Sequence, residues 1–275
     1  MEKSRILFVT QEITPFLSES NLAETVRKIS QGVHEKDKEI RIFMPRFGVV
    51  NERRHQLHEV IRLSGMNLIV DDTDHPLIIK VASIPQARIQ VYFIDNEEFF
   101  KRKRVFDDEN GKFAKDNDER AIFFCRGVAE TVKKLGWSPD IVHCHGWMAA
   151  FMPLYLKNMY NDDPHFVNAK TMFSVYGNGF EGNLSNTILE KIAFDGIPTE
   201  DLVLKNSADS DNVNMLGVQF ADTIGIGDQA INSQLLSYIE SSGKPTLEYQ
   251  DEENLVEAHQ EFYDKVLSEN GVLAE

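Results

Sequence analysis

The stretch that decides the fold is Pro139-Asp140-Ile141-Val142-His143-Cys144-His145-Gly146-Trp147. Its proline and aspartate predict a turn, and the residues from 141 to 143 predict a buried β-strand. Two histidines and a tryptophan are delivered where that strand ends. In an open parallel α/β sheet, ligands bind in the crevice outside the carboxyl ends of the strands. The stretch therefore predicts a parallel sheet with a candidate site at its edge.

Other short runs rich in β-branched and aromatic residues alternate with helical patterns along the chain. They cover residues 6–9, 40–44, 91–94, 171–175 and 223–226. Near-continuous apolar strands that alternate with helices are typical of a parallel sheet covered on both faces. The predicted fold class is therefore α/β, with a doubly wound, mainly parallel, Rossmann-like sheet.

One long helix and one hairpin are also predicted. Apolar residues at Phe124, Val128, Val132 and Leu135 keep helical spacing, which predicts a helix over 118–135 that stops at the following glycine. Between residues 59 and 94, two apolar runs at 60–63 and 77–82 flank the polar turn 71–74. That pattern predicts an antiparallel hairpin inserted on the sheet.

The end of the chain differs in composition from the rest. Residues 243–245 (GKP) break the preceding helix, and residues 248–253 are mostly acidic. A final helix is predicted over about 252–267, with one apolar edge formed by Leu255, Phe262, Val266 and Leu267. We expect a domain over 1–245, followed at 246–275 by an acidic linker and a helix that packs back on the domain.

Composition excludes several classes of function. The 275 residues carry a formal net charge of −15 and no basic stripe, which disfavours nucleic acid as a partner. The densest basic run, residues 101–104 (KRKR), is followed by acidic residues and reads as a solvated loop. No stretch approaches the roughly 20 apolar residues of a membrane helix, and residues 6–9 are too few for a signal-peptide core. Only Cys125 and Cys144 occur, so we expect no disulfide framework and a cytoplasmic protein.

The two histidines of the deciding stretch alternate with Cys144, so both imidazoles should project to one face of the strand. A metal would need further ligands, and no second Cys/His cluster appears, so we expect neither a metal nor another cofactor. His145 could instead hydrogen-bond a sugar hydroxyl, while Trp147 could offer a flat face to a pyranose ring. The alternative, a buried structural histidine beside a core tryptophan, stays open.

Two further places carry candidate site residues. Asp116 precedes the long helix, where a helix cap is an equally good explanation. Glu12 and Phe16 follow the first strand, in the turn that commonly faces the ligand of a doubly wound fold. Residues 14–21 of that turn contain no glycine, so the backbone is poorly suited to approach a phosphate. The loop 177–182 is glycine-containing but reads as flexible, and no GxSxG elbow occurs.

In its order of strand ends, turns and candidate site residues, the chain resembles the N-terminal domain of bacterial glycogen synthases and plant starch synthases. These are retaining glycosyltransferases of two-domain GT-B architecture that extend α-1,4-glucan from ADP-glucose. The similarity extends in order and spacing over roughly residues 5 to 240. The matching blocks are 6–16 (ILFVTQEITPF), 44–48 (MPRFG), 91–96 (VYFIDN), 116–120 with Phe123, 135–147, 155–157, 163–164, 168–171 and 220–222.

The resemblance implies roles for individual residues and also reveals departures from the family pattern. It implies that Glu12, Asp116 and His145 are catalytic-site residues and that Phe16, Trp147 and Tyr176 contact substrate. The family's lysine-x-glycine-glycine donor loop corresponds to residues 18–21 (SESN), so Ser18 replaces the lysine and Asn21 a glycine. The family's histidine-aspartate-tryptophan-histidine run reads HGWM at 145–148, and its later histidine-asparagine pair reads YG at 176–177.

The resemblance also implies what the chain should lack. We expect it to be a single N-terminal half of the GT-B architecture, without the C-terminal Rossmann domain that binds most of ADP-glucose in this family. Glucosyl transfer develops negative charge on the leaving diphosphate, which must meet preorganised positive groups. The expected function is thus glucan or maltooligosaccharide binding, or regulation, by a pseudoenzyme with a degenerate donor site. Two alternatives stay open: a glycosyltransferase half completed by a separate donor-domain polypeptide, and a protein-interaction module on a retained scaffold.

Overall fold

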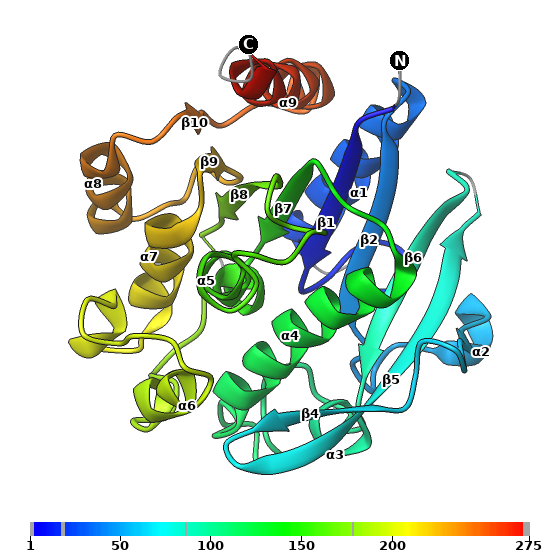
Figure 1. Ribbon diagram of the computed structural model, residues 1–275, viewed down its shortest axis with the longest axis vertical. Coiled ribbons are helices and arrows are strands. Elements are labelled where there is room, and N and C mark those ends of the chain that lie inside the picture. The colour runs from blue at the N-terminus through cyan, green and yellow to red at the C-terminus, as the bar shows by residue number, and fades with distance from the viewer. Residues whose placement is uncertain (1–2, 18–19, 86, 178, 272–275) are drawn as a thin grey trace.

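The computed structural model describes residues 3–17, 20–85, 87–177 and 179–271, and its centre is a mixed, mainly parallel sheet (Figure 1). The strand order is β10-β9-β8-β7-β1-β2-β6-β5-β3, and β4 pairs with β5. The parallel strands are β1 (Arg5–Thr10), β2 (Glu39–Pro45), β6 (Ile89–Asp95), β7 (Ile141–His145), β8 (Lys170–Val175), β9 (Thr223–Ile226) and β10 (Thr246–Leu247). The predicted α/β class and all six predicted strands are confirmed.

The predicted hairpin exists, but its first arm was misplaced. Strand β4 (Met66–Val70) pairs antiparallel with β5 (Thr73–Ile84) across a turn in which Asp71 and Asp72 both have positive φ. Residues 60–63, which the sequence suggested as that arm, form a turn instead. In β4 the burial alternates along the strand, because β4 lies outside the main sheet path and only one of its faces is covered. The short β3 (His58–Glu59) pairs with the other end of β5.

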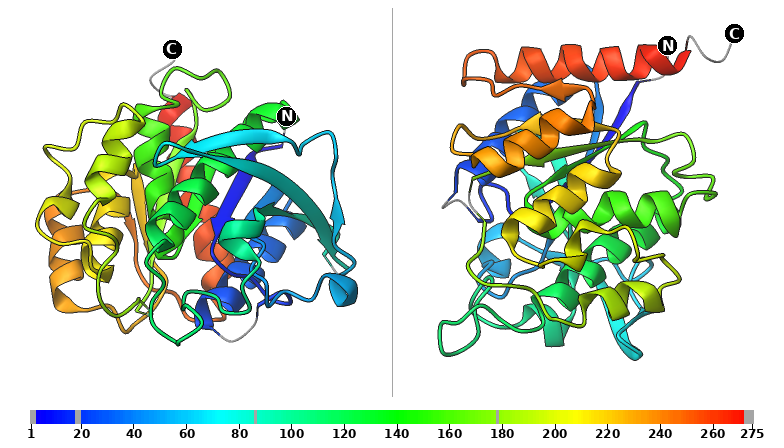
Figure 2. Two further views of the ribbon diagram at one scale, coloured as in Figure 1. Left: turned by 90° about the horizontal axis from the view of Figure 1, so that it is seen from below. Right: turned by 90° about the vertical axis from the view of Figure 1, so that its left-hand side faces the viewer.

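The helices form two layers that follow from the order of the strands. The chain steps from β1 to β2 in one direction across the sheet and from β6 through β7 and β8 to β9 in the other. Because parallel crossovers are right-handed, the two directions place their helices on opposite faces. Helix α1 (Asn21–Glu35) therefore covers one face, while α4 (Asn117–Leu135), α5 (Phe151–Asn158) and α7 (Ser210–Phe220) cover the other (Figures 1 and 2). The predicted long helix is confirmed as α4.

Smaller elements complete the chain between and beyond these layers. They are α2 (Glu52–His55), α3 (Glu97–Phe100), the 3₁₀ turn η1 (Trp147–Ala150), α6 (Ile188–Phe194), the 3₁₀ turn η2 (Val203–Lys205) and α8 (Ser233–Ser242). Lys191 of α6 bonds Asp118 of α4 at 2.8 Å, and both side chains are buried. This ion pair holds the long connection between β8 and α7, which contains α6, against α4 in the helical layer.

The last helix, α9 (Leu255–Gly271), covers the part of the sheet face that α1 leaves open (Figure 2). It packs against α1, where a Cβ at Gly32 would lie 2.4 Å from a methyl carbon of Val256. Tyr263 and His259 of α9 are buried against the histidines of β7. Strand β10 starts directly after the proposed domain boundary at residue 245 and adds to the edge of the same sheet.

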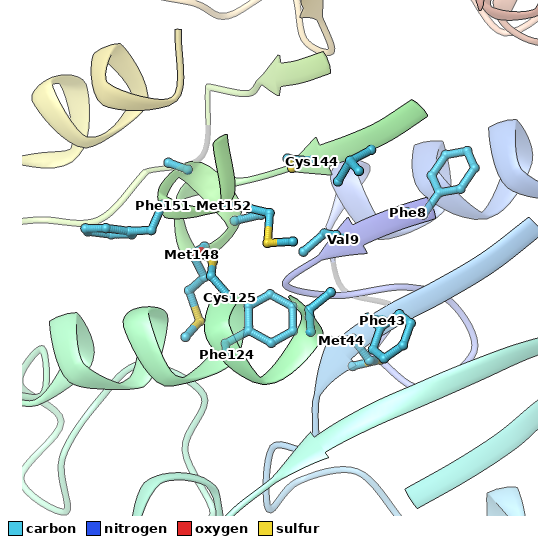
Figure 3. Close-up of a cluster of buried hydrophobic side chains, with 14 of the residues drawn as sticks. Phe8, Val9, Phe43, Met44, Phe124, Cys125, Cys144, Met148, Phe151 and Met152 are labelled. Carbon is cyan, nitrogen blue, oxygen red and sulfur yellow. Dashed lines mark hydrogen bonds between the residues drawn. The ribbon is translucent and has the colours of Figure 1, made fainter. Parts of the chain in front are cut away.

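Strand β7 separates two chemically different environments. Its odd-numbered histidines face α9, whereas Cys144 faces the helical layer of α4 and α5, in a cluster with Val9, Cys125 and Met152 (Figure 3). Cys125 Sγ donates to the carbonyl oxygen of Met148 at 3.3 Å, and burial raises the pKa of both thiols. The alternation along one strand thus places an apolar, sulfur-containing core on one face and a polar cluster on the other.

Candidate functional site

The candidate site lies where the strand order reverses, between the carboxyl ends of β1 and β7. Thr10 of β1 and His145 of β7 are in register there. Gln11 follows β1 and is buried, and its Oε1 accepts from the backbone N–H of Met148 at 3.3 Å. Gly146 has φ +81°, and a Cβ on it would lie 2.5 Å from Gln11 Oε1. A glycine is therefore required at this position, because the two strand ends close on each other through Gln11.

The two histidines of β7 point to the same face, as predicted, and their ring centroids are 3.8 Å apart. Both are fully buried. His145 Nδ1 is 2.8 Å from the hydroxyl of Tyr176, which stands at the end of β8, while its Nε2 has no hydrogen-bond partner among the described residues. Burial lowers the pKa of both imidazoles well below 6.5, so they are neutral near pH 7.

His143 belongs to a second chain of hydrogen bonds beneath α9. Its Nδ1 is 2.6 Å from the hydroxyl of Tyr263 and its Nε2 is 2.7 Å from Ser174 Oγ. His259 of α9 stacks at 5.9 Å from His143, and its Nδ1 donates to the carbonyl oxygen of Leu255 at 2.7 Å. Sequence reasoning missed Tyr263 and His259, because no local pattern relates them to His143, which lies 120 positions from Tyr263 in the chain.

Trp147 is buried rather than displayed. Only 2% of it is exposed, and its ring lies 4.9 Å from Phe180, 5.1 Å from Phe106 and 5.8 Å from Phe113. Phe106 and Phe113 come from the loop before α4, and Phe180 comes from the loop after β8. Within the part of the chain that the structure describes, the indole Nε1 has no hydrogen-bond partner. The flat face expected for a pyranose ring is therefore covered by three phenylalanines in this conformation.

Asp116 occupies the N-cap position of α4 but makes no side-chain capping bond. Its carboxylate instead forms a paired hydrogen bond with the guanidinium of Arg102, with Nη1 to Oδ1 at 2.9 Å. The explanation of Asp116 as a helix cap is therefore wrong. In addition, Arg102 of the basic run 101–104 pairs with a candidate site residue, so the run is not simply a solvated loop. A paired guanidinium–carboxylate contact fixes the orientation of both groups.

The remaining predicted site residues are spread over the first βα turn. Glu12 is partly buried and accepts from Gln11 Nε2 at 3.3 Å. Phe16 is 5% exposed and packs edge-on against Phe93 at 4.9 Å, so it is part of the core. Asn21 begins α1, and Ser20 caps that helix by accepting from the N–H of Ala23 at 3.1 Å.

Ser18 lies outside the described residues. In the part of the chain that the structure describes, no three His, Cys, Asp or Glu side chains come together as a metal-binding group. Among those same residues, no helix is both long and apolar enough to cross a bilayer. The structure thus joins His145 directly to Tyr176 and places Asp116, Trp147 and Phe16 in separate clusters.

The doubly wound, mainly parallel sheet has the fold of the Rossmann-like half of a GT-B glycosyltransferase. The model of the starch synthase catalytic domain family matches residues 5–239. The chain belongs to the glycogen and starch synthase family.

Individual relatives agree with this assignment. The glycogen synthase of Chlorobium limicola is 39% identical over 223 residues, which are 80% of this chain and 45% of that protein. The glycogen synthase of Chlorobaculum parvum is 34% identical over 245 residues, 86% of this chain and 48% of that protein. The chain thus spans about half the length of the curated relatives it matches. Starch synthase IV of Arabidopsis thaliana has the same fold, with a TM-score of 0.73 at 17% identity over 91% of this chain and 52% of that one.

Proposed function

We propose that this chain binds α-glucan and does not by itself transfer glucose from ADP-glucose, which makes it a pseudoenzyme of its family. The observation that carries the proposal is the start of α1. Where the family's loop supplies a lysine and two glycines, this sequence reads SESN at 18–21, and Ser20 serves as a helix cap. Capping satisfies the backbone N–H of Ala23, which a donor phosphate could otherwise use. A leaving diphosphate would meet no loop cation here.

The acceptor side of the site retains more of the family's chemistry. From the family resemblance we assign Glu12, Asp116 and His145 to the polar part of a glucan site and Phe16, Trp147 and Tyr176 to its aromatic part. His145 and Tyr176 contact each other directly, whereas the clusters that hold Asp116, Trp147 and Phe16 would have to come together around a glucan. His145 is neutral, and its Nε2 could hydrogen-bond a sugar hydroxyl, but because the side chain is fully buried this contact requires the surrounding loops to open. The rings of Phe113 and Phe180 are stacked on each other at 4.5 Å, and both cover the indole of Trp147. Contact between glucan and Trp147 therefore requires the loops that carry these two phenylalanines to open.

Binding of maltoheptaose to the full chain tests the proposal, with tryptophan fluorescence and calorimetry as readouts. The Arabidopsis starch synthase IV domain was solved with ADP and acarbose, which motivates testing an oligosaccharide and a nucleotide sugar separately. Tyr176→Phe should weaken maltoheptaose binding several-fold, because it removes the hydroxyl that orients His145. Tyr263→Phe is the matched control, since it removes an equivalent bond to His143, away from the strand end. A wild-type chain that binds no maltoheptaose would overturn the proposal.

A second candidate is a transferase half that a separate donor-domain polypeptide completes. It is motivated by the retention of Glu12, Asp116 and His145 beside the altered loop at 18–21. This candidate predicts that the purified chain elongates glucan only after cell extract without its own synthase is added. We further propose a cytoplasmic location, because both cysteines are free thiols in the structure and a reducing compartment preserves such thiols.

A further inference from the structure

A cavity of about 160 Å³ lies between the first turns of α1, the carboxyl ends of β8 and β9, and the C-terminal segment, residues 246–271. Glu24 and Lys28 line it from α1, and Tyr176 lines it from the end of β8. Gln250, Glu252 and His259 line it from the C-terminal segment. These last residues fall outside the stretch 5–239 that matches the family model. The cavity is therefore a property of this chain and not of the family domain alone.

The walls of the cavity are polar and offer both hydrogen-bond donors and acceptors. His259 is 6% exposed, and its Nδ1 must donate to the carbonyl of Leu255, because a carbonyl only accepts. Burial lowers the pKa of His259 to about 4, so at neutral pH its Nε2 is a bare acceptor. Lys28 Nζ lies 2.8 Å from a carboxylate oxygen of Glu252. Gln250 adds an amide, which can donate and accept.

Charge and size restrict the ligand that this lining can take. Two carboxylates, Glu24 and Glu252, face a single ammonium at Lys28, so the cavity has a negative surplus that disfavours phosphates and other anions. Hydroxyl groups suit such a lining, since each can donate to a carboxylate or imidazole and accept from an amide or ammonium. The cavity volume accommodates on the order of ten non-hydrogen atoms, each about the size of a water molecule. This number is close to the number of non-hydrogen atoms in one hexose.

We propose that this cavity binds a single uncharged hexose unit, either as a free monosaccharide or as the end of an α-glucan chain. The C-terminal segment then acts as one wall of a sugar site. Its Glu252 is tied to Lys28, and the neighbouring helix α9 adds an ion pair between Lys38 and Asp264. Tyr176 lines this cavity and also belongs to the proposed glucan site, so the assignment rests in that residue on the proposed function, whereas the walls from α1 and the C-terminal segment are separate from it.

Titration of the full chain with D-glucose, maltoheptaose and inorganic phosphate tests the assignment. Glucose should bind with a dissociation constant on the order of millimolar, as expected for so small a ligand. Glu24→Gln and Gln250→Ala should each weaken glucose binding about tenfold. Glu248→Gln is the matched control, because its side chain belongs to the same segment but does not line the cavity. Equal weakening of maltoheptaose by Gln250→Ala would identify the glucan end as the occupant.

Several outcomes would overturn the assignment. One is that no glucose binds at a glucose concentration about 50-fold above the expected dissociation constant of ~1 mM. The others are that the cavity variants and the control bind glucose with equal affinity, or that phosphate binds more tightly than glucose. The two proposals fail separately. If glucose binds and depends on Gln250 while maltoheptaose does not bind, the cavity site stands and the glucan-binding proposal falls. If maltoheptaose binding depends on Tyr176 but glucose does not bind at all, the reverse holds.

Discussion

Acidification should destabilise this protein steeply, because three neutral imidazoles are buried together beneath α9. His143 and His145 have pKa values well below 6.5, and burial lowers the pKa of His259 to about 4. The unfolded chain would protonate each of these groups near pH 6.5. Since the folded pKa values are depressed, the stabilisation is complete above pH 6.5 and is lost as the pH falls toward 4.

The size of the effect follows from proton linkage. One unit of pKa difference corresponds to about 1.4 kcal/mol, so His259 alone should cost about 3 kcal/mol of unfolding free energy at pH 4. With three such groups, the unfolding free energy should fall by about 4 kcal/mol per pH unit once the unfolded chain is protonated. The loss by pH 5 is about 6 kcal/mol, so a domain at the lower end of the usual 5–15 kcal/mol range would be close to unfolding there.

Urea denaturation at pH 7.5, 6.5, 6.0 and 5.5 measures this slope directly. His259→Phe should reduce the slope by about one third, whatever it does to the absolute stability, because one of the three titrating groups is gone. The exposed His58→Gln is the matched control, which removes an imidazole without touching the cluster. The reasoning is refuted if stability is flat from pH 7.5 to 5.5, or if His259→Phe and His58→Gln change the slope equally.

Three other substitutions test the packing that positions the site. Gly146→Ala should cost about 2–4 kcal/mol in urea denaturation, since the residue has φ +81° and its new Cβ would press on Gln11; an unchanged midpoint would contradict the close approach. Lys191→Met should cost about 3–5 kcal/mol by leaving buried Asp118 unpaired, and adding Asp118→Asn should recover part of the loss. Gly32→Leu should lift α9 from α1 and speed amide exchange throughout α9, whereas unaltered protection would show that α9 is held elsewhere.

The parallel sheet could be predicted because its strands are buried on both faces. Continuous apolar runs such as residues 6–9 and 171–175 are therefore visible locally. The first arm of the hairpin was harder, because β4 is only half buried and reads Met-Asn-Leu-Ile-Val, while the similarly apolar run at 60–63, Val-Ile-Arg-Leu, forms a turn. Periodicity alone does not distinguish a short half-buried strand from an apolar turn.

The site was only partly predictable because its contacts are long-range. The position of His143 and His145 followed from strand alternation, which is a local rule. The partners of these residues did not follow, since Tyr263 reaches His143 from a helix at the end of the chain. The covering of Trp147 likewise depends on loops before α4 and after β8, and loop conformation has no comparable periodic signal.

We propose that the chain binds glucan without donor-dependent transfer. The most direct test incubates one preparation of the full chain with maltoheptaose and radiolabelled ADP-glucose, and measures both bound oligosaccharide and label in elongated glucan. We predict saturable maltoheptaose binding and no label in glucan above a protein-free control. Elongated, labelled glucan formed by the purified chain alone would contradict the claim.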